Sequence, residues 1–285
     1  MKNIDLSYFK GKKVPILIEK ADELFKENIE GKIHAHKIYN LILDQIPIKY
    51  DDNNFHVLRG ILRQKIWNCE KSFFWNENFF SQSGQDRILK NHFFTNKKKG
   101  FFVEIGAYDG INGSNCYHFE KFLNWDGIAI EPSIIQFEKL KKNRKCKVLN
   151  KAISDVTKDV KFIEVTEGLT QMSGINDNYF KRNLDIISNN EISKTKTLNL
   201  KTTTFDEIVP QNTNIDYLSI DIEGGELSLL KSINFDIFTI KVISVENNTP
   251  KDQNFKSFFK NKNFSYFDRF GQDEIFYNNN FFKFE

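Results

Sequence analysis

The sequence predicts an α/β protein with a mostly parallel sheet, preceded by a helical region. Residues 1–75 contain three apolar stripes with spacings of three or four residues, which are typical of amphipathic helices. After about residue 95, short apolar runs alternate with amphipathic segments, as in a parallel sheet whose strands are linked by helices. We therefore expect a helical unit at 1–80 and a sheet domain at 81–285.

The elements of both regions can be placed from their periodicity. The helical stripes fall at 17–25, 35–46 and 58–66. Strand candidates are 101–105, 127–131, 146–149, 160–165, 217–222 and 241–246, with 266–269 and 274–277 as a closing hairpin around Gly271. Helices are expected at about 114–124, 133–143, 224–231 and 253–261. Residues 166–195 lack a clear period and are expected to form a long loop with at most one helix, of a kind that often binds ligands.

Composition excludes several classes of protein. With 285 residues, 40% hydrophobic and 28% charged, the chain is not disordered as a whole. A net charge of +3 argues against a nucleic-acid partner held by bulk charge. The Lys- and Arg-rich run 139–147 is expected to be a solvated face.

Cysteine usage and hydropathy bear on the compartment. Cys69, Cys116 and Cys146 are too widely spaced for a CxxC zinc site, and an odd count does not suggest a disulfide framework. The first 15 residues lack a signal-peptide pattern, and no apolar stretch approaches the roughly 20 residues of a membrane span. We expect a cytoplasmic protein without a membrane span.

The most informative stretch is GFFVEIGAYDGINGSN at residues 100–115. An apolar strand ends near Glu104, and Gly106 and Asp109 precede a helix start at Ser114. Glycines let the backbone approach a ligand, and a helix N-terminus favours its negatively charged end. Acidic residues here would repel a pyrophosphate, which disfavours a nicotinamide oxidoreductase. S-adenosylmethionine carries a sulfonium, an ammonium and a single carboxylate, and so fits better.

Two later positions complete a nucleoside site. The second strand ends in Glu131, followed by Pro132, and a carboxylate there can accept both ribose hydroxyls. After the third strand, Asp155 is placed to accept from an adenine amino group.

The chain resembles the FkbM-type S-adenosylmethionine methyltransferases. The matching segments are SQSGQD (81–86), GFFVEIGAYDG (100–110), SNCYHFEK (114–121), WDGIAIEP (125–132), IDYLSIDIEGGE (215–226) and VISVENN (242–248). The resemblance implies a Rossmann-like class I methyltransferase sheet and methyl transfer to a hydroxyl, commonly on a sugar. The sequence departs from the usual pattern at Cys116, often Thr, and at Asn247, often His. The expected cofactor residues are Gln85, Glu104, Gly106, Ala107, Asp109, Ser114, Asn115, Glu131, Pro132 and Asp155.

Carboxylates follow the fourth and fifth strands. Asp221 and Glu223 end the fourth strand, and Glu246 and Asn247 end the fifth. With the usual methyltransferase strand order, these side chains meet at one sheet edge. Asp221, Glu246 and Asn247 would suit Mg²⁺ or another divalent metal, which could lower the pKa of an acceptor hydroxyl. Without metal, Asp221 or Glu223 must be the base, and Glu246 is the third catalytic candidate.

The function that the resemblance implies is S-adenosylmethionine-dependent O-methylation of a carbohydrate hydroxyl. The resemblance points to a nucleotide-activated sugar for surface polysaccharide as the acceptor. A noncatalytic subunit with the same fold would lack the carboxylates, and an N-methyltransferase remains an alternative. The helical unit is expected either to contribute to a homodimer or to cover the acceptor site, because its apolar stripes need burial.

Overall fold

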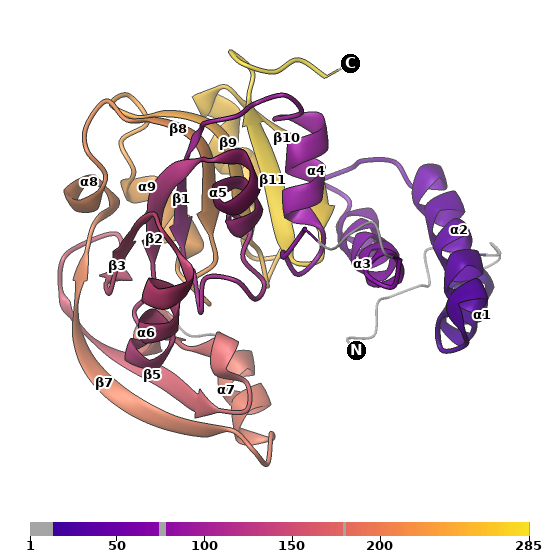
Figure 1. The fold of residues 1–285 in the computed structure, drawn as a ribbon, viewed down its shortest axis with the longest axis horizontal. Coiled ribbons are helices and arrows are strands. Elements are labelled where there is room, and N and C mark those ends of the chain that lie inside the picture. Colours follow the sequence, from indigo (N-terminus) through magenta and orange to yellow (C-terminus); the bar gives the residue numbers. More distant parts are fainter. Residues whose placement is uncertain (1–13, 74–77, 179–180, 285) are drawn as a thin grey trace.

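The protein is built around a seven-stranded sheet, drawn in Figure 1. The structure, a computed structural model, describes residues 14–73, 78–178 and 181–284. The strands are β1 (Phe101–Ile105), β2 (Asp126–Ile130), β3 (Lys147–Leu149), β8 (Asn214–Ile220), β9 (Thr239–Glu246), β10 (Phe264–Phe270) and β11 (Asp273–Asn278). Their order is β10-β11-β9-β8-β1-β2-β3. The five strands from β9 to β3 pair in parallel, and β11 pairs antiparallel with both of its neighbours. Each predicted strand of this sheet is confirmed.

Helices bury both faces of this sheet. On β1, Phe102 packs with Leu89 and Phe119 on one face, whereas Val103 packs with Leu229 on the other. Such alternation, with apolar residues on both faces, is expected for a parallel strand covered on two sides. The helices of the first face are α4 (Gln85–His92), α5 (Tyr117–Leu123) and α6 (Ile134–Asn143). The helices of the second face are α8 (Phe205–Ile208), α9 (Glu226–Ser232) and α10 (Phe255–Phe259). A short 3-10 helix, η5 (Lys260–Lys262), follows α10.

A second, four-stranded sheet lies beside the first. It consists of β4 (Ala152–Ile153), β5 (Asp159–Glu167), β6 (Gly174–Ile175) and β7 (Lys194–Thr203), in the order β4-β7-β5-β6. Figure 1 shows β5 and β7 as a long curved pair with α7 (Lys181–Ser188) nearby. The strand expected at 160–165 is confirmed as β5, but it belongs to this second sheet. The segment 166–195, expected as a loop with at most one helix, contains α7 together with η3 (Thr170–Met172), β6 and η4 (Asn176–Asn178).

The three predicted N-terminal helices are present as α1 (Val14–Phe25), α2 (Ile29–Gln45) and α3 (Asn53–Glu70). Asn28 and Asp52 begin α2 and α3, where their side chains accept from backbone N–H groups of the first turn. Figure 1 shows α3 between the α1–α2 pair and the edge of the sheet at β10 and β11.

Buried polar contacts join α3 to this edge. Arg59 forms an ion pair with Asp268 of β10 at 2.8 Å, and the His56 ring is hydrogen-bonded to Glu274 of β11 at 2.8 Å. At the turn between these strands, the N–H of Gly271 donates to the carbonyl of Gly60 at 2.9 Å. The helical region is therefore anchored to the sheet by groups that are costly to separate.

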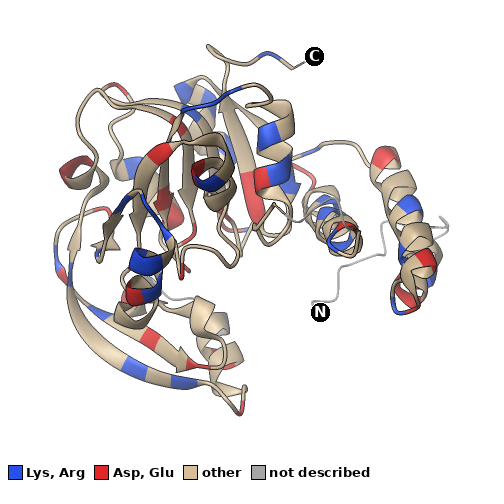
Figure 2. Cartoon of the chain, viewed as in Figure 1, with Lys and Arg blue, Asp and Glu red and all other residues tan. Residues whose placement is uncertain are grey.

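The distribution of charged residues and the hydropathy of the helices can be compared with the expectations from the sequence. Figure 2 shows Lys and Arg interspersed with Asp and Glu along the helices and strands of this view. Among the described residues, no helix combines the length and the apolar character that crossing a bilayer requires.

Candidate functional site: a cavity at the carboxyl ends of the parallel strands

The glycine-rich loop after β1 touches the end of β8. Gly106 has φ of 86°, a left-handed conformation that favours glycine. A Cβ atom at this position would clash with the carbonyl oxygen of Asp221. The N–H of Asp221 donates to the carbonyl of Ile105 at 3.0 Å, so the two strand ends are held together by their backbones. A residue other than glycine would push the loop away from Asp221.

Glu104 lies beneath this loop and organises it. One carboxylate oxygen accepts from the Ser114 hydroxyl at 2.7 Å and from the N–H of Asn115 at 3.0 Å. The other forms an ion pair with Arg144 at 2.7 Å. Glu104 therefore fixes the start of α5 from behind and does not line the cavity.

Arg144 corrects the expectation of a solvated face at 139–147. Its side chain is fully buried and pairs with both Glu104 and Glu120. It also donates to the carbonyl of Gly110 at 3.2 Å, within the glycine-rich loop. The neighbouring Lys141, by contrast, is about half exposed, as expected for that face.

Glu131 directly follows β2, at the opposite side of the loop. Its carboxylate oxygens accept from the N–H groups of Tyr108 at 2.9 Å and Ser133 at 2.8 Å. Burial raises the pKa of Glu131 to about 7, although these two hydrogen bonds lower it. The carboxylate is thus held in one orientation at the tip of the strand.

A cavity of about 350 Å³ runs from Glu131 to the end of β8, a size in the range of small-molecule sites. It brings together eight of the predicted site residues. These are Gly106, Ala107, Ser114, Glu131, Pro132, Asp221, Glu223 and Glu246.

The remaining predicted site residues lie outside the cavity lining. Gln85 and Asn115 both donate to the buried carboxylate of Asp273, at 2.9 and 3.2 Å. Asp109 accepts from the N–H groups of residues 111 and 112 and so shapes the loop from within. Asp155 accepts from the hydroxyl of its neighbour, residue 154, at 2.9 Å. Their polar side chains are therefore used on neighbouring residues, outside the lining of the cavity.

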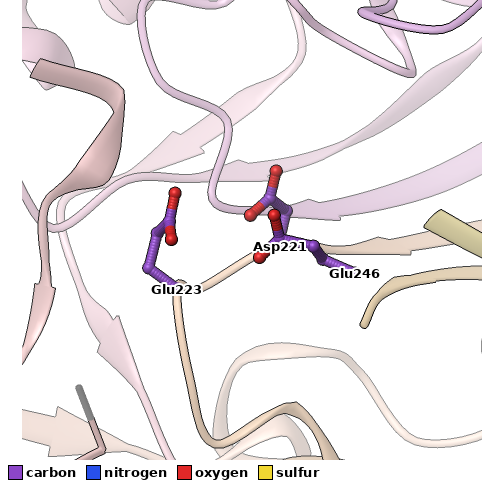
Figure 3. Close-up of side chains that lie close together, drawn as sticks. All are labelled: Asp221, Glu223 and Glu246. Atoms are coloured by element: carbon purple, nitrogen blue, oxygen red, sulfur yellow. The ribbon is translucent and has the colours of Figure 1, made fainter. Parts of the chain in front are cut away.

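Three carboxylates meet at the other end of the cavity. One carboxylate oxygen from each of Asp221, Glu223 and Glu246 lies within 4.8 Å of the other two. Figure 3 shows the three side chains gathered at this point. Burial raises the pKa values of Asp221 and Glu246 well above the ordinary range, and repulsion from the neighbouring carboxylates adds to this. Either a shared proton or a bound cation would relieve this repulsion.

Glu223 takes the place in this cluster that was expected for Asn247. The amide of Asn247 donates to Glu274 at 2.6 Å and to the carbonyl of Gln253, while its oxygen accepts from the N–H of Thr249. Glu223 has φ of 58°, a strained conformation for a residue with a side chain.

Sequence reasoning missed Asn183 on α7. Its side-chain amide donates to Glu223 at 2.9 Å, and so the second sheet and its helix close the carboxylate end of the cavity. The sequence held no local signal for this role of Asn183; only the strand β7 of the second sheet could have been recognised, from the alternation of Leu198 and Leu200 with polar residues.

The methyltransferase FkbM domain model matches residues 104–270. The chain belongs to the FkbM methyltransferase family. Family membership and the strand order together confirm the predicted Rossmann-like class I methyltransferase fold.

Solved structures and curated proteins give further comparisons. The FkbM methyltransferase of Methylobacillus flagellatus is 11% identical, with a TM-score of 0.43 over 84% of this chain; the chain spans 57% of that protein. A TehB-like SAM-dependent methyltransferase of Corynebacterium glutamicum is 8% identical, with a TM-score of 0.36 over 76% of this chain and 97% of its own. The N-terminal domain of human METTL16, solved in complex with SAH, is 11% identical, with a TM-score of 0.35 over 98% of both chains. No curated protein matches the sequence.

Proposed function

We propose that this FkbM-family methyltransferase uses S-adenosylmethionine to methylate a hydroxyl group of a carbohydrate. The observation that carries the proposal is the backbone contact between Gly106 and Asp221. It joins a loop suited to the cofactor and a cluster of candidate bases within one cavity. Family membership supports methyl transfer, and the resemblance of the motifs supports a sugar hydroxyl as the acceptor.

The residues at the loop end fit the cofactor. Glu131 would accept from the ribose hydroxyls, and Ser114 would face the methionyl carboxylate near the start of α5. The acidic end of the cavity would favour the sulfonium and ammonium groups. S-adenosylmethionine, once bound, supplies an electrophilic methyl carbon.

The carboxylate cluster would supply the base. Because the pKa values of Asp221 and Glu246 are raised, one member of the pair retains an affinity for a proton at neutral pH. The acceptor hydroxyl would pass its proton to this carboxylate while its oxygen bonds to the methyl carbon. The electrons of the carbon–sulfur bond would stay on sulfur, so that S-adenosylhomocysteine would be the second product. The cavity walls would orient the two reactants and exclude water.

The same cluster suits a divalent metal, which is the second version of this mechanism. Asp221, Glu223 and Glu246 would offer hard oxygen ligands to Mg²⁺. The metal would lower the pKa of the acceptor hydroxyl. Activity that survives EDTA and does not respond to added Mg²⁺ or Mn²⁺ would exclude this version.

Two experiments test the proposal. In isothermal titration we expect S-adenosylhomocysteine to bind and NAD not to bind. With a panel of sugars and mass spectrometry, we expect a gain of one methyl group on oxygen. Methylation of nitrogen only would instead support an N-methyltransferase. Cofactor binding with no transfer to any acceptor would support a noncatalytic subunit.

A substitution then tests the base. Asp221→Asn keeps the shape but removes the base and an anionic metal ligand, so turnover should fall about 10² to 10⁴-fold with cofactor affinity within a few-fold. Glu223→Gln is the control. Near-normal turnover in Asp221→Asn, together with loss of activity in Glu223→Gln or Glu246→Gln, would show that the base is assigned wrongly.

A further inference from the structure

Four side-chain amides line the cavity, two at the glycine-rich loop and two beside the end of β9. They belong to Gln82, Gln171, Asn248 and Gln272. Gln82, Gln171 and Gln272 are exposed and Asn248 is half-buried, so their amides are open to solvent at the mouth of the cavity, whereas Asn183 uses its amide on Glu223. We refer to these four side chains as the amide rim.

The amide rim is formed from segments far apart in the sequence. Gln82 and Gln171 meet at the glycine-rich loop, because a Cβ on Gly113 would lie 3.3 Å from one amide nitrogen and 3.6 Å from the other. Asn248 follows Glu246 by two residues. Gln272 is held next to it, since its carbonyl accepts from the N–H of Asn247 at 3.0 Å. Amides therefore stand on the loop side and on the β9 side of the cavity.

Among the lining residues that the structure describes, those near the carboxylate cluster carry charge of one sign. Of the described lining residues, Asp221, Glu223 and Glu246 are acidic and Lys151 is basic. Lys151 belongs to the other end, because the amide of the preceding Asn150 donates to the carbonyl of Glu131 at 2.8 Å. A phosphate group placed near the three carboxylates would be repelled and would have no cation among these residues to pair with.

We infer that the amide rim recognises an uncharged, polyhydroxylated acceptor, such as a neutral glycoside, and not the phosphorylated part of a nucleotide-activated sugar. Each carboxamide offers both a donor and an acceptor, which matches the two roles of a sugar hydroxyl. This inference rests on the proposed function and narrows its acceptor from any activated sugar to a neutral one.

The test compares matched acceptors. Methyl glycosides of glucose, galactose, mannose and rhamnose are set against the corresponding sugar 1-phosphates and nucleoside-diphosphate sugars, with EDTA and with Mg²⁺. We expect at least one neutral glycoside to be methylated with kcat/KM about tenfold or more above its phosphorylated counterparts in both conditions. A preference for a phosphorylated acceptor in either condition overturns the inference and leaves sugar methylation intact. Absence of transfer to every sugar overturns the proposed function, and this inference with it.

Variants then test the amide rim itself on the best neutral acceptor. Asn248→Ala and Gln272→Ala should each raise KM for the acceptor at least fivefold and leave the dissociation constant of S-adenosylhomocysteine within twofold. Gln272→Lys should shift the kcat/KM ratio toward the sugar 1-phosphate. Gln211→Ala is the matched control. Gln211 is an exposed amide in the loop before β8, at the amino-terminal end of that strand, whereas the cavity lies at the carboxyl ends. If acceptor KM in both alanine variants stays within twofold of the parent value, the amide rim does not contact the acceptor.

Discussion

Replacing Arg144 by Met should destabilise the protein and weaken its cofactor site together. The arginine is fully buried between Glu104 and Glu120, which are 4% and 8% exposed, and no other described cation pairs with either. Removing one partner of a buried ion pair typically costs about 3 to 5 kcal/mol. Glu104 keeps its bonds from Ser114 and Asn115, so we expect the lower end, about 3 kcal/mol. The loop would also lose the hydrogen bond at Gly110, which should weaken S-adenosylhomocysteine binding by about 1 kcal/mol.

Urea denaturation followed by circular dichroism measures the first effect and isothermal titration the second. Lys141→Met is the matched control, because Lys141 lies in the same basic run but is about half exposed, and it should change stability by less than about 0.5 kcal/mol. The double variant Arg144→Met with Glu104→Gln should recover about 1 to 2 kcal/mol, since Gln removes the unpaired charge and still accepts from Ser114. A loss below about 1 kcal/mol in Arg144→Met, or no recovery in the double variant, would refute the reasoning.

Three further outcomes are expected. Glu131→Ala should weaken S-adenosylhomocysteine binding by about 1 to 3 kcal/mol, because ribose hydroxyls lose a buried acceptor; an unchanged affinity in titration would remove Glu131 from the site. The pKa of Glu131 is raised from 4.5 to about 7, so the stability from its protonated form is complete below pH 4.5 and lost as pH rises through about 7. The melting temperature between pH 5.5 and 8 should therefore fall less in Glu131→Gln than in the parent, and equal slopes would contradict this. A chain starting at residue 76 should lose cooperative unfolding in calorimetry, because Asp268 and Glu274 lose buried partners on α3; a parental melting transition would show that α3 is dispensable.

The main sheet could be predicted because its signals are local. Strands β1, β2 and β8 are short apolar runs that end in Gly, Asp or Glu, and the helices between them have regular stripes. Glu131 and the carboxylates Asp221 and Glu246 follow directly from these strand ends, so their arrival in one cavity was also predictable. Periodicity located the strand ends, and the strand order that the family resemblance implies brought them to one edge of the sheet.

The parts that were missed depend on partners distant in the sequence. Nothing near Arg144 shows that Glu104, 40 residues earlier, will bury its charge. Gln85 matched the family motif, but its amide is used on Asp273, 188 residues later. The strand β7 is largely exposed, with Lys and Thr between few apolar residues, so its pairing with β5 left only a weak pattern. Burial and partner choice at these positions are decided by tertiary contacts.

The contacts of α3 bear on how the chain folds during synthesis. His56 pairs with a residue 218 positions later, and Arg59 with one 209 positions later. At a synthesis rate of about 5 to 20 residues per second, Arg59 waits roughly 10 to 40 s for its carboxylate partner. Until then α3 can form its turns and pack with α2, but its polar groups must remain hydrated. The α3 side chains can therefore form their ion pairs only after the β10–β11 hairpin has been made. Because these contacts are distant in the sequence, the contact order is high and slow folding is expected.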